Sequence, residues 1–551
     1  MNRRSLLKHL AATIPTIALS NQLSAANNLL NEANDNRISG PFEPNWNSLT
    51  QFKTPDWYRN AKFGIWAHWG PQCQPEYGDW YAREMYMEGH WKYKYHVEKY
   101  GHPSKFGFKD VINEWKAEAW DPEELVSFYK KAGAKYFMAL ANHHDNLDLY
   151  KSKYQKNWNA TKVGPKKDLI GGWEKAARKN DLYFGVSVHA AHAWSWMETA
   201  QRADKNGPFA GVPYDGKLTK ADGKGKWWDG LDPQELYEQQ HELSLNSYDN
   251  GMIHKQWNWA EGVNKPSKAY CEKFYKRTID LIDSYDPDLI YFDDTALPLW
   301  PISDAGLRIA AHLYNKSIKK NGTQETVIFG KILTEMQRKC LIWDIERGQS
   351  NAIEALPWQT CTCIGDWHYS RSIYDQKRYK SAKTVIHTLA DVVSKNGNLL
   401  LSVPVRGSGA IDDQERAIVA EIGEWMAVNS EAIYDTRPWK VFGEGPAMES
   451  AAPLSAQGFN EGKGKAFTAA DLRFTVKGNA VYAIAMGWPA DGKIIIKSMR
   501  KVGGNLNQPI QAVQLVGSGQ NLIFNQNDNE LIVQLNENRP KLPYAIALKI
   551  V

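Results

Sequence analysis

The feature of this sequence that most constrains its fold is a repeated alternation of short strand-like runs with longer helix-like stretches. Parallel strands need long crossover connections, which are usually helices, so this alternation predicts an α/β fold with a parallel sheet. Eight such units predict a closed (β/α)8 barrel of the TIM type. The eight runs are rich in β-branched or aromatic residues and lie at residues 63–68, 136–141, 183–189, 289–293, 327–331, 341–346, 360–364 and 399–404.

Helix signals between these runs agree with a parallel sheet. Asp121 and Pro122 supply an N-cap and a first-turn proline, and apolar residues then recur at helical spacing until Gly133. A second helix is predicted over residues 267–285, and the breaker at residues 286–288 ends it directly before the next strand run. This order of helix, breaker and strand is typical of α/β folds.

Two regions depart from the alternation. Residues 190–266 form a long insertion rich in Gly, Lys and Trp, and loops of that length are usually functional lids or partner surfaces. Near residue 438 the pattern changes to short alternating runs separated by Gly, Asn and Asp, which predicts an all-β sandwich. We therefore predict a catalytic barrel over residues 45–437, with the insertion inside it, and a smaller β-sandwich over residues 438–551.

The N-terminus carries an export pattern. Paired arginines, an apolar run and a small-residue site at residues 24–26 predict a twin-arginine-type signal peptide over residues 1–26. An ordinary N-terminal helix is the alternative, but Pro15 interrupts it. Cleavage would remove Arg3, Arg4 and Lys8 and no acid, which lowers the formal charge from +5 to +2. We expect a periplasmic or secreted protein with a disordered leader over residues 27–44.

Composition excludes several classes of protein. Apolar residues make up 43% of the chain, and the small net charge is unlike that of a nucleic-acid binder. No run after the signal approaches the ~20 apolar residues that span a bilayer, so no membrane span is expected. The 23 Trp and 26 Tyr are unusually many and suit either bulky cores or sugar binding. The five irregularly spaced cysteines predict buried thiols rather than disulfides or a zinc site.

Polar residues follow the strand runs at the end where barrel enzymes carry their active groups. They are His68, then His143, His144 and Asp145, then His189 with His192, and then Asp293 and Asp294. A single histidine is more often structural than functional. Four successive runs that end in His or Asp favour a functional site.

Two chemistries can use such a cluster. Imidazoles with an Asp can hold zinc in a barrel hydrolase, but the sequence has no HExxH motif. In addition, the adjacent His143 and His144 would point apart if strand geometry continued through them. The other chemistry is glycoside hydrolysis, in which one carboxylate attacks the anomeric carbon and another protonates the leaving oxygen. Asp293 is the candidate for the first carboxylate.

Several segments, in the same order along the chain, resemble the α-L-fucosidases of glycoside hydrolase family 29. The resemblance extends over about residues 45–450, and it implies a catalytic barrel followed by a β-sandwich. The segments that carry it are residues 62–70 (KFGIWAHWG), 79–81 (DWY), 135–145, 158–159, 286–293 (DPDLIYFD), 357–362 (PWQTCT), 367–369, 397–401, Trp425 with Asn429, 432–434 and 443–446.

The resemblance also implies roles for individual residues. Asp293 would be the nucleophile, and no cofactor is expected. Residues implied to bind the sugar are His68, His143, His144, Tyr291 and either Asp79 or Trp80.

This chain departs from the family pattern in two places. The run at residues 185–189 lacks a Tyr that touches fucose in the family, so His189 or His192 is expected to substitute. Asp294 stands where the family has a small residue. The general acid/base must be argued from position, and the candidates are Glu346, Glu354 and Glu335. Glu346 is preferred because it ends a strand run, whereas Glu335 lies in a polar, helix-like stretch.

We therefore expect an exo-acting, retaining α-L-fucosidase that acts on fucosylated oligosaccharides or polysaccharides. Both a monomer and a homo-oligomer are compatible with the sequence. The same machinery acting on a related sugar such as L-galactose is one alternative. A metal-dependent barrel hydrolase built on the histidines is a second, and a non-catalytic sugar-binding protein is a third.

Overall fold

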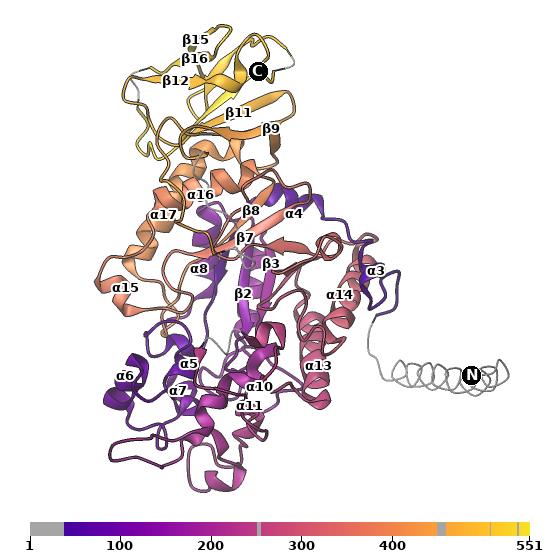
Figure 1. Cartoon of the computed structure of the whole chain (residues 1–551), viewed down its shortest axis with the longest axis vertical. Coiled ribbons are helices and arrows are strands. Elements are labelled where there is room, and N and C mark those ends of the chain that lie inside the picture. The colour runs from indigo at the N-terminus through magenta and orange to yellow at the C-terminus, as the bar shows by residue number, and fades with distance from the viewer. Residues whose placement is uncertain (1–37, 251–254, 449–458, 507, 537–538) are drawn as a thin grey trace, which may run out of the picture.

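The computed structural model describes residues 38–250, 255–448, 459–506, 508–536 and 539–551. The predicted signal peptide and residues 27–37 of the predicted leader lie outside these ranges. Figure 1 shows a barrel in the middle of the molecule and an all-β domain at one end. In the described part of the chain, no helix is both long and apolar enough to cross a membrane.

The eight predicted strand runs form a closed parallel barrel, in the order β1 to β8 around the ring. Ile65 of β1 pairs with Phe137 of β2 on one side and with Leu401 of β8 on the other, which closes the sheet. Every residue of most of these strands is buried, because a barrel strand faces core on both sides. The strands are β1 (Phe63–Ala67), β2 (Tyr136–Asn142), β3 (Tyr183–Val188), β4 (Leu289–Phe292), β5 (Val327–Gly330), β6 (Ile342–Asp344), β7 (Trp358–Cys363) and β8 (Gly397–Ser402).

Helices cover the outside of the barrel, and both helix predictions are confirmed. Asp121 and Ser267 cap their helices by accepting the backbone N–H groups of Glu124 and Tyr270. The longer helices are α6 (Trp91–Tyr100), α8 (Pro122–Lys131), α9 (Leu169–Lys179), α13 (Lys268–Tyr285), α14 (Ala305–Asn321), α16 (Ala382–Ser394) and α17 (Asp413–Asn429). Shorter ones are α3 (Trp46–Leu49), α4 (Asp56–Ala61), α5 (Tyr81–Glu84), α7 (Phe108–Glu114), α10 (Ala193–Trp196), α11 (Gln234–Tyr237) and α15 (Arg371–Asp375).

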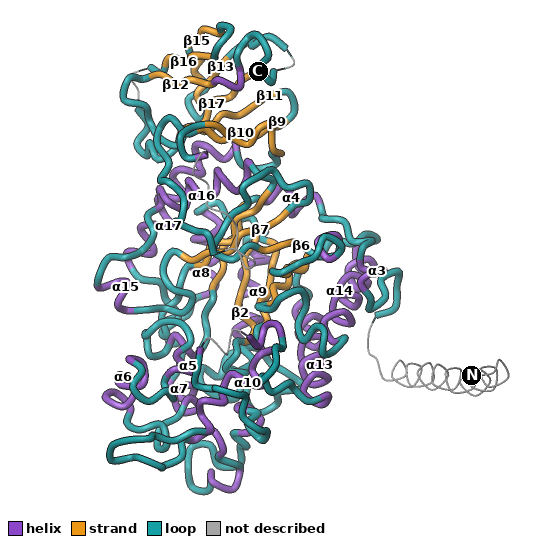
Figure 2. The backbone as a smooth tube through the Cα atoms, in the orientation of Figure 1, coloured by secondary structure: helices purple, strands orange, loops and turns teal. Residues whose placement is uncertain are grey.

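The 190–266 insertion packs beside the barrel mouth as short helices and loops. It contains α10 and α11, and Figure 2 shows mostly loop around α5, α7 and α10. Trp257 is buried and its indole N–H donates to the backbone oxygen of Asp293, 3.2 Å away. The insertion therefore contributes directly to the barrel mouth.

Residues 38–44 were predicted to be part of a disordered leader, and for these residues the prediction is wrong. The N–H of Phe42 donates to Oδ1 of Asn315 in α14 at 3.0 Å, and the Phe42 ring is buried. Asn315 donates in return to the backbone oxygens of Ile38 and Phe42. Polar side chains on α14 thus satisfy the backbone of this segment, which its Asn-rich context did not indicate.

The C-terminal domain consists of two antiparallel sheets with an apolar core between them. The larger sheet has the order β14-β13-β17-β11-β10-β9, and the smaller has the order β12-β16-β15. The strands are β9 (Arg437–Glu444), β10 (Leu472–Lys477), β11 (Ala480–Ala485), β12 (Lys493–Ile496), β13 (Val513–Leu515), β14 (Gln520–Asn521), β15 (Ile523–Gln526), β16 (Leu531–Gln534) and β17 (Ile546–Ile550). This is the all-β domain that the alternating runs predict.

The domain is anchored to the barrel helices by polar contacts. Arg473 of β10 pairs with the buried Asp391 of α16, and the Trp425 indole of α17 donates to the backbone oxygen of Ala545. All five cysteines are free and buried, as predicted.

Candidate active site

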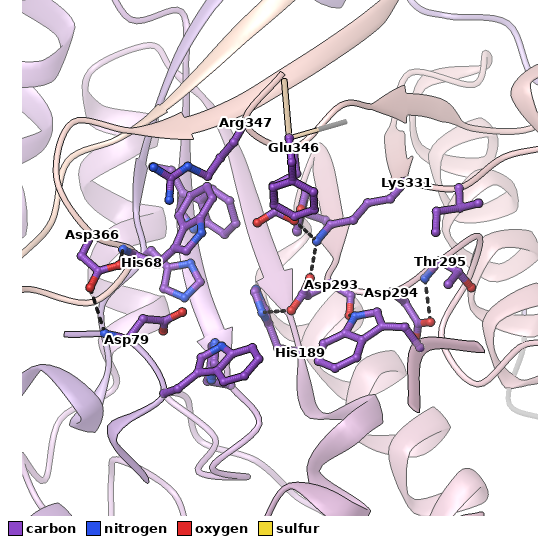
Figure 3. Close-up of a pocket in the computed structure, with 18 residues that line it drawn as sticks. His68, Asp79, His189, Asp293, Asp294, Thr295, Lys331, Glu346, Arg347 and Asp366 are labelled. Carbon is purple, nitrogen blue, oxygen red and sulfur yellow. Dashed lines mark hydrogen bonds and ion pairs between the residues drawn. The ribbon is translucent and has the colours of Figure 1, made fainter. Parts of the chain in front are cut away.

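A cavity of about 350 Å³ opens at the carboxyl ends of the barrel strands. Most of the predicted site residues line it, although they come from six different strand ends or loops (Figure 3). The lining residues are Trp66, His68, Asp79, Trp80, His143, His189, Trp257, Tyr291, Asp293, Asp294, Thr295, Lys331, Ile332, Glu346, Arg347, Asp366, Trp367 and Phe459.

Asp293 lies directly after β4 and is held by three groups. Its Oδ2 atom is 3.0 Å from His144 Nε2 and 3.4 Å from His189 Nδ1, and its Oδ1 accepts from the Lys331 ammonium group. Burial alone would raise the pKa of Asp293, but Lys331 and the two imidazoles outweigh it and hold the pKa well below its usual range. Asp293 is therefore an ionised carboxylate in a buried cavity, as a nucleophile requires.

Lys331 lines the cavity as well, although no sequence pattern singled it out. It lies directly after β5, and its ammonium group contacts both Asp293 and Glu346 (Figure 3). Burial would lower the pKa of Lys331, but the two carboxylates outweigh it and raise the pKa well above its usual value. The only sequence signal was its position as the last residue of a predicted strand run.

Glu346 lies two residues after β6. It lines the cavity and forms an ion pair with Lys331. The two other acid/base candidates lie elsewhere. Glu354 pairs with Arg338 at 2.6 Å and accepts from the Ser350 hydroxyl, and it does not line the cavity. Glu335 is exposed. Of the three candidates, only Glu346 meets Asp293 in one cavity.

The histidines form a buried, aromatic-lined wall. Among the residues that the structure describes, neither ring nitrogen of His68 has a hydrogen-bond partner. Burial, followed by repulsion from His368, lowers the pKa of His68 well below its usual value. Burial likewise lowers the pKa of His143 well below its usual value and that of His189 to about 4. His144 does not line the cavity but contacts Asp293 directly. Neutral imidazoles with open nitrogens are suited to hydrogen-bonding sugar hydroxyls.

Asp79, Trp80 and Tyr291 complete the set of predicted site residues. Asp79 Oδ1 lies 2.6 Å from His368 Nδ1, and its backbone N–H donates to Asp366. The Trp80 ring packs edge-on against Trp196, and Tyr291 lines the cavity beside Lys331. His368 and Asp366 are further residues that sequence reasoning did not single out, although residues 367–369 belong to a segment that carries the resemblance.

Asp294 and His192 face each other at the edge of the site. The Asp294 carboxylate accepts the backbone N–H groups of Thr295 and Leu299, and its Oδ2 lies 3.3 Å from His192 Nε2. His192 is stacked on Trp257, with ring centroids 4.5 Å apart. Asp294 also lines the cavity, but its carboxylate oxygens contact its own loop and His192, whereas those of Asp293 contact Lys331 and the two imidazoles.

His143 and His144 do not point apart, as they would if strand geometry continued through them. β2 ends at Asn142, so the two residues lie beyond the strand and both turn toward the site. Ligand atoms of His143, His144 and His189 lie within 4.8 Å of one another, as do those of His68, Asp79, His143 and His368. The geometry of the described residues therefore admits a metal ion as well as a sugar.

Comparison with known proteins decides the family. A family model described as α-L-fucosidase matches residues 29–431, and a second, described as the α-L-fucosidase C-terminal domain, matches residues 465–551. The chain belongs to the α-L-fucosidase family. It is accordingly a glycoside hydrolase, and its two domains correspond to the two family models.

Individual members of the α-L-fucosidase family align along most of the chain. Tissue α-L-fucosidase of Homo sapiens is 25% identical over 465 residues, which cover 83% of this chain and 81% of that protein. The Rattus norvegicus enzyme is 25% identical over 467 residues, with the same coverage. The solved structure of the Thermotoga maritima α-fucosidase in complex with fucose superposes on this chain with a TM-score of 0.66 at 25% identity. The superposition covers 93% of this chain and 100% of the Thermotoga maritima chain.

Proposed function

We propose that this protein is an exo-acting, retaining α-L-fucosidase that releases terminal α-L-fucose from oligosaccharides or polysaccharides. The observation that carries the proposal is the contact of Asp293 and Glu346 with one ammonium group, that of Lys331. Because one oxygen of each carboxylate contacts the same Nζ atom, those two oxygens lie no more than about 5 Å apart, which agrees with the ~5 to 5.5 Å of retaining glycosidases better than with the ~6.5 to 9.5 Å of inverting ones.

In this mechanism Asp293 attacks the anomeric carbon and forms a glycosyl ester, while Glu346 gives its proton to the leaving glycosidic oxygen. Glu346 then takes a proton from water as that water attacks the ester. Lys331 keeps Asp293 ionised, and the neutral histidines hold the sugar hydroxyls. The modest volume of the cavity and its position at the barrel mouth support binding of a terminal sugar.

Turnover of aryl glycosides tests the proposal. We expect hydrolysis of 4-nitrophenyl α-L-fucoside, with α-L-fucose as the first product in a proton NMR time course. First formation of the β anomer would contradict the assignment of Asp293 as nucleophile. Faster turnover of the α-L-galactoside would favour the alternative sugar, for which His189 is a candidate partner of the extra C6 hydroxyl.

A metal-dependent hydrolase is a second candidate function, because the clustered imidazoles could hold a metal ion. Exhaustive treatment with EDTA distinguishes it from the carboxylate-based fucosidase. We expect full activity on the aryl fucoside after chelation, since carboxylates carry both proposed steps. Loss of activity that zinc restores would support the metal-dependent alternative.

A further inference from the structure

A second pocket, of about 460 Å³, lies between α16 and the segment at residues 460–467. Its lining is strongly basic. Lys380, Lys383, Lys395, Lys465 and Arg473 face only two acids, Asp391 and Glu461. That is an excess of three positive charges in one pocket, whereas the whole chain carries a formal +5.

The excess charge extends into the buried floor of the pocket. Lys395 and Arg473 share a single carboxylate, that of Asp391, at 2.6 and 2.5 Å. Their side chains are only 6% and 3% exposed, and that of Asp391 is 2% exposed. Burial, together with repulsion from Arg473, outweighs Asp391 and lowers the pKa of Lys395. A buried cation without its own counter-ion is costly, so the floor favours binding of an anion.

The rim of the pocket adds two accessible cations. Lys383 and Lys465 are exposed, and neither forms an ion pair within the part of the chain that the structure describes. Lys380 already pairs with Glu461 at 2.6 Å. The two rim lysines are thus available to a ligand and can be changed without disturbing the buried floor.

The remaining lining suits a sugar. The Arg473 guanidinium lies over the Phe467 ring, 4.6 Å from the ring centroid. Phe467 also lines the pocket and gives it an aromatic surface. Thr384 and Thr388 also line the pocket, and the Thr388 hydroxyl, which donates to the Thr384 backbone oxygen at 3.0 Å, can still accept from a sugar hydroxyl. Aromatic, hydroxyl and cationic groups together match a saccharide that bears an oxyanion.

The second pocket adjoins the active-site cavity through one short segment. Phe459 lines the active-site cavity, and the next two residues, Asn460 and Glu461, line the second pocket. We propose that the second pocket binds an oxyanion substituent, a sulfate ester or a carboxylate, of the glycan whose terminal sugar occupies the active-site cavity. The proposal rests on the proposed function, but the binding itself can be measured without catalysis.

Calorimetric titration of the full chain tests the proposal. The probes are a sulfated fuco-oligosaccharide, the same oligosaccharide after desulfation, and an oligouronate of equal length. We expect the sulfated or the carboxylated probe to bind with an affinity that falls as salt increases, and the desulfated probe to bind at least about tenfold more weakly. The ranking of the two anionic probes identifies the oxyanion.

The variants are a double charge reversal at the rim, Lys383→Glu with Lys465→Glu, and a matched control, Lys217→Glu with Lys220→Glu. The control lysines are exposed in the 190–266 insertion, and both variants change the net charge equally. We expect roughly tenfold weaker binding of the anionic probe by the rim variant only, with unchanged hydrolysis of the aryl fucoside. Equal binding by both variants, or equal binding of sulfated and desulfated probes, would overturn the inference. An inactive wild-type enzyme would instead overturn the proposed function.

Discussion

At the scale of single residues, Lys331 holds the proposed nucleophile, Asp293, in its ionised form. Two carboxylates in one buried cavity repel each other, and one of them would take up a proton. The ammonium group between Asp293 and Glu346 removes that repulsion in the free enzyme. In the proposed mechanism Glu346 must leave this ion pair and take up a proton before it acts as the acid.

Replacement of Lys331 predicts a shift in the pH profile. In the wild type the pKa of Asp293 lies well below its usual range, so the carboxylate is ionised throughout the working pH range. In Lys331→Met only the two imidazoles still offset burial, so the pKa of Asp293 rises and the acidic limb of kcat/KM moves to higher pH. Lys331→Arg retains the charge and is the control. An acidic limb that does not move would contradict this role.

Replacement of Asp293 predicts loss of the chemical step. Asp293→Gly should lower kcat on the aryl fucoside by on the order of 10³ or more, because no other group forms the covalent intermediate. Azide should restore part of the activity by entering the vacated space, and the product sugar should then be a fucosyl azide. Asp294→Ala is the matched control, and a larger loss in that variant would transfer the nucleophile role to Asp294.

Replacement of Glu346 predicts an effect that depends on the leaving group. Glu346→Ala should retain much more activity on 4-nitrophenyl fucoside than on a fucosylated disaccharide, since a good leaving group needs little protonation. Relative kcat/KM on the two substrates measures this. Glu354→Ala, whose carboxylate is bound to Arg338, should leave the ratio unchanged. An equal loss on both substrates would remove Glu346 from the acid role.

At the scale of elements, the segment at residues 459–461 holds the loop that carries Glu346. The Phe459 N–H donates to the Glu346 backbone oxygen at 3.0 Å, and the Glu461 N–H donates to that of Arg347 at 2.9 Å. Asn460 accepts the N–H of Gln349 at 2.8 Å and donates to its carbonyl at 3.0 Å. A segment beyond the last barrel helix therefore positions the loop that carries the proposed acid/base, Glu346.

Asn460→Ala tests this positioning role. The variant loses both side-chain bonds to Gln349, so the loop is less well held. We expect kcat on a fucosylated disaccharide to fall by about tenfold, with a smaller change for 4-nitrophenyl fucoside, because protonation by Glu346 is impaired. Asn460→Asp keeps the oxygen that accepts the Gln349 N–H, so its kcat on the disaccharide should lie between those of the wild type and Asn460→Ala. Asn521→Ala, exposed in β14, is the control, and equal kinetics in Asn460→Ala and this control would contradict the role.

At the scale of the whole molecule, the N-terminal export pattern remains a proposal, because it lies outside the described residues. Replacement of Arg3 and Arg4 by Lys should keep the precursor in the cytoplasm, since receptors of twin-arginine signals read the arginine pair. Cell fractionation and the precursor mass measure this. Lys8→Arg, which preserves the pair, should export normally. Normal export of the Arg3→Lys, Arg4→Lys variant would indicate another route.

Local patterns in the sequence were sufficient to predict the eight barrel strands, the helices near residues 122 and 268, and the all-β domain. Strand and helix periodicities depend on backbone geometry within a few residues, so a single sequence carries them. The same patterns placed His68, His143, His189 and Asp293 at strand ends, where a barrel brings them together. The expected reaction, hydrolysis of an α-L-fucoside, came from the resemblance to the α-L-fucosidase family.

Only the tertiary structure decided which groups meet. Lys331 comes between Asp293 and Glu346 because β4, β5 and β6 are neighbours whose following residues converge on one point. Trp257 and Phe459 reach the cavity from an insertion and from a segment beyond the barrel, and no local periodicity marks such residues. The burial that lowers the pKa of the histidines and the charge imbalance beside α16 likewise depend on what packs around each group. Packing between segments distant in sequence therefore determines the chemistry of residues that the sequence alone could only nominate.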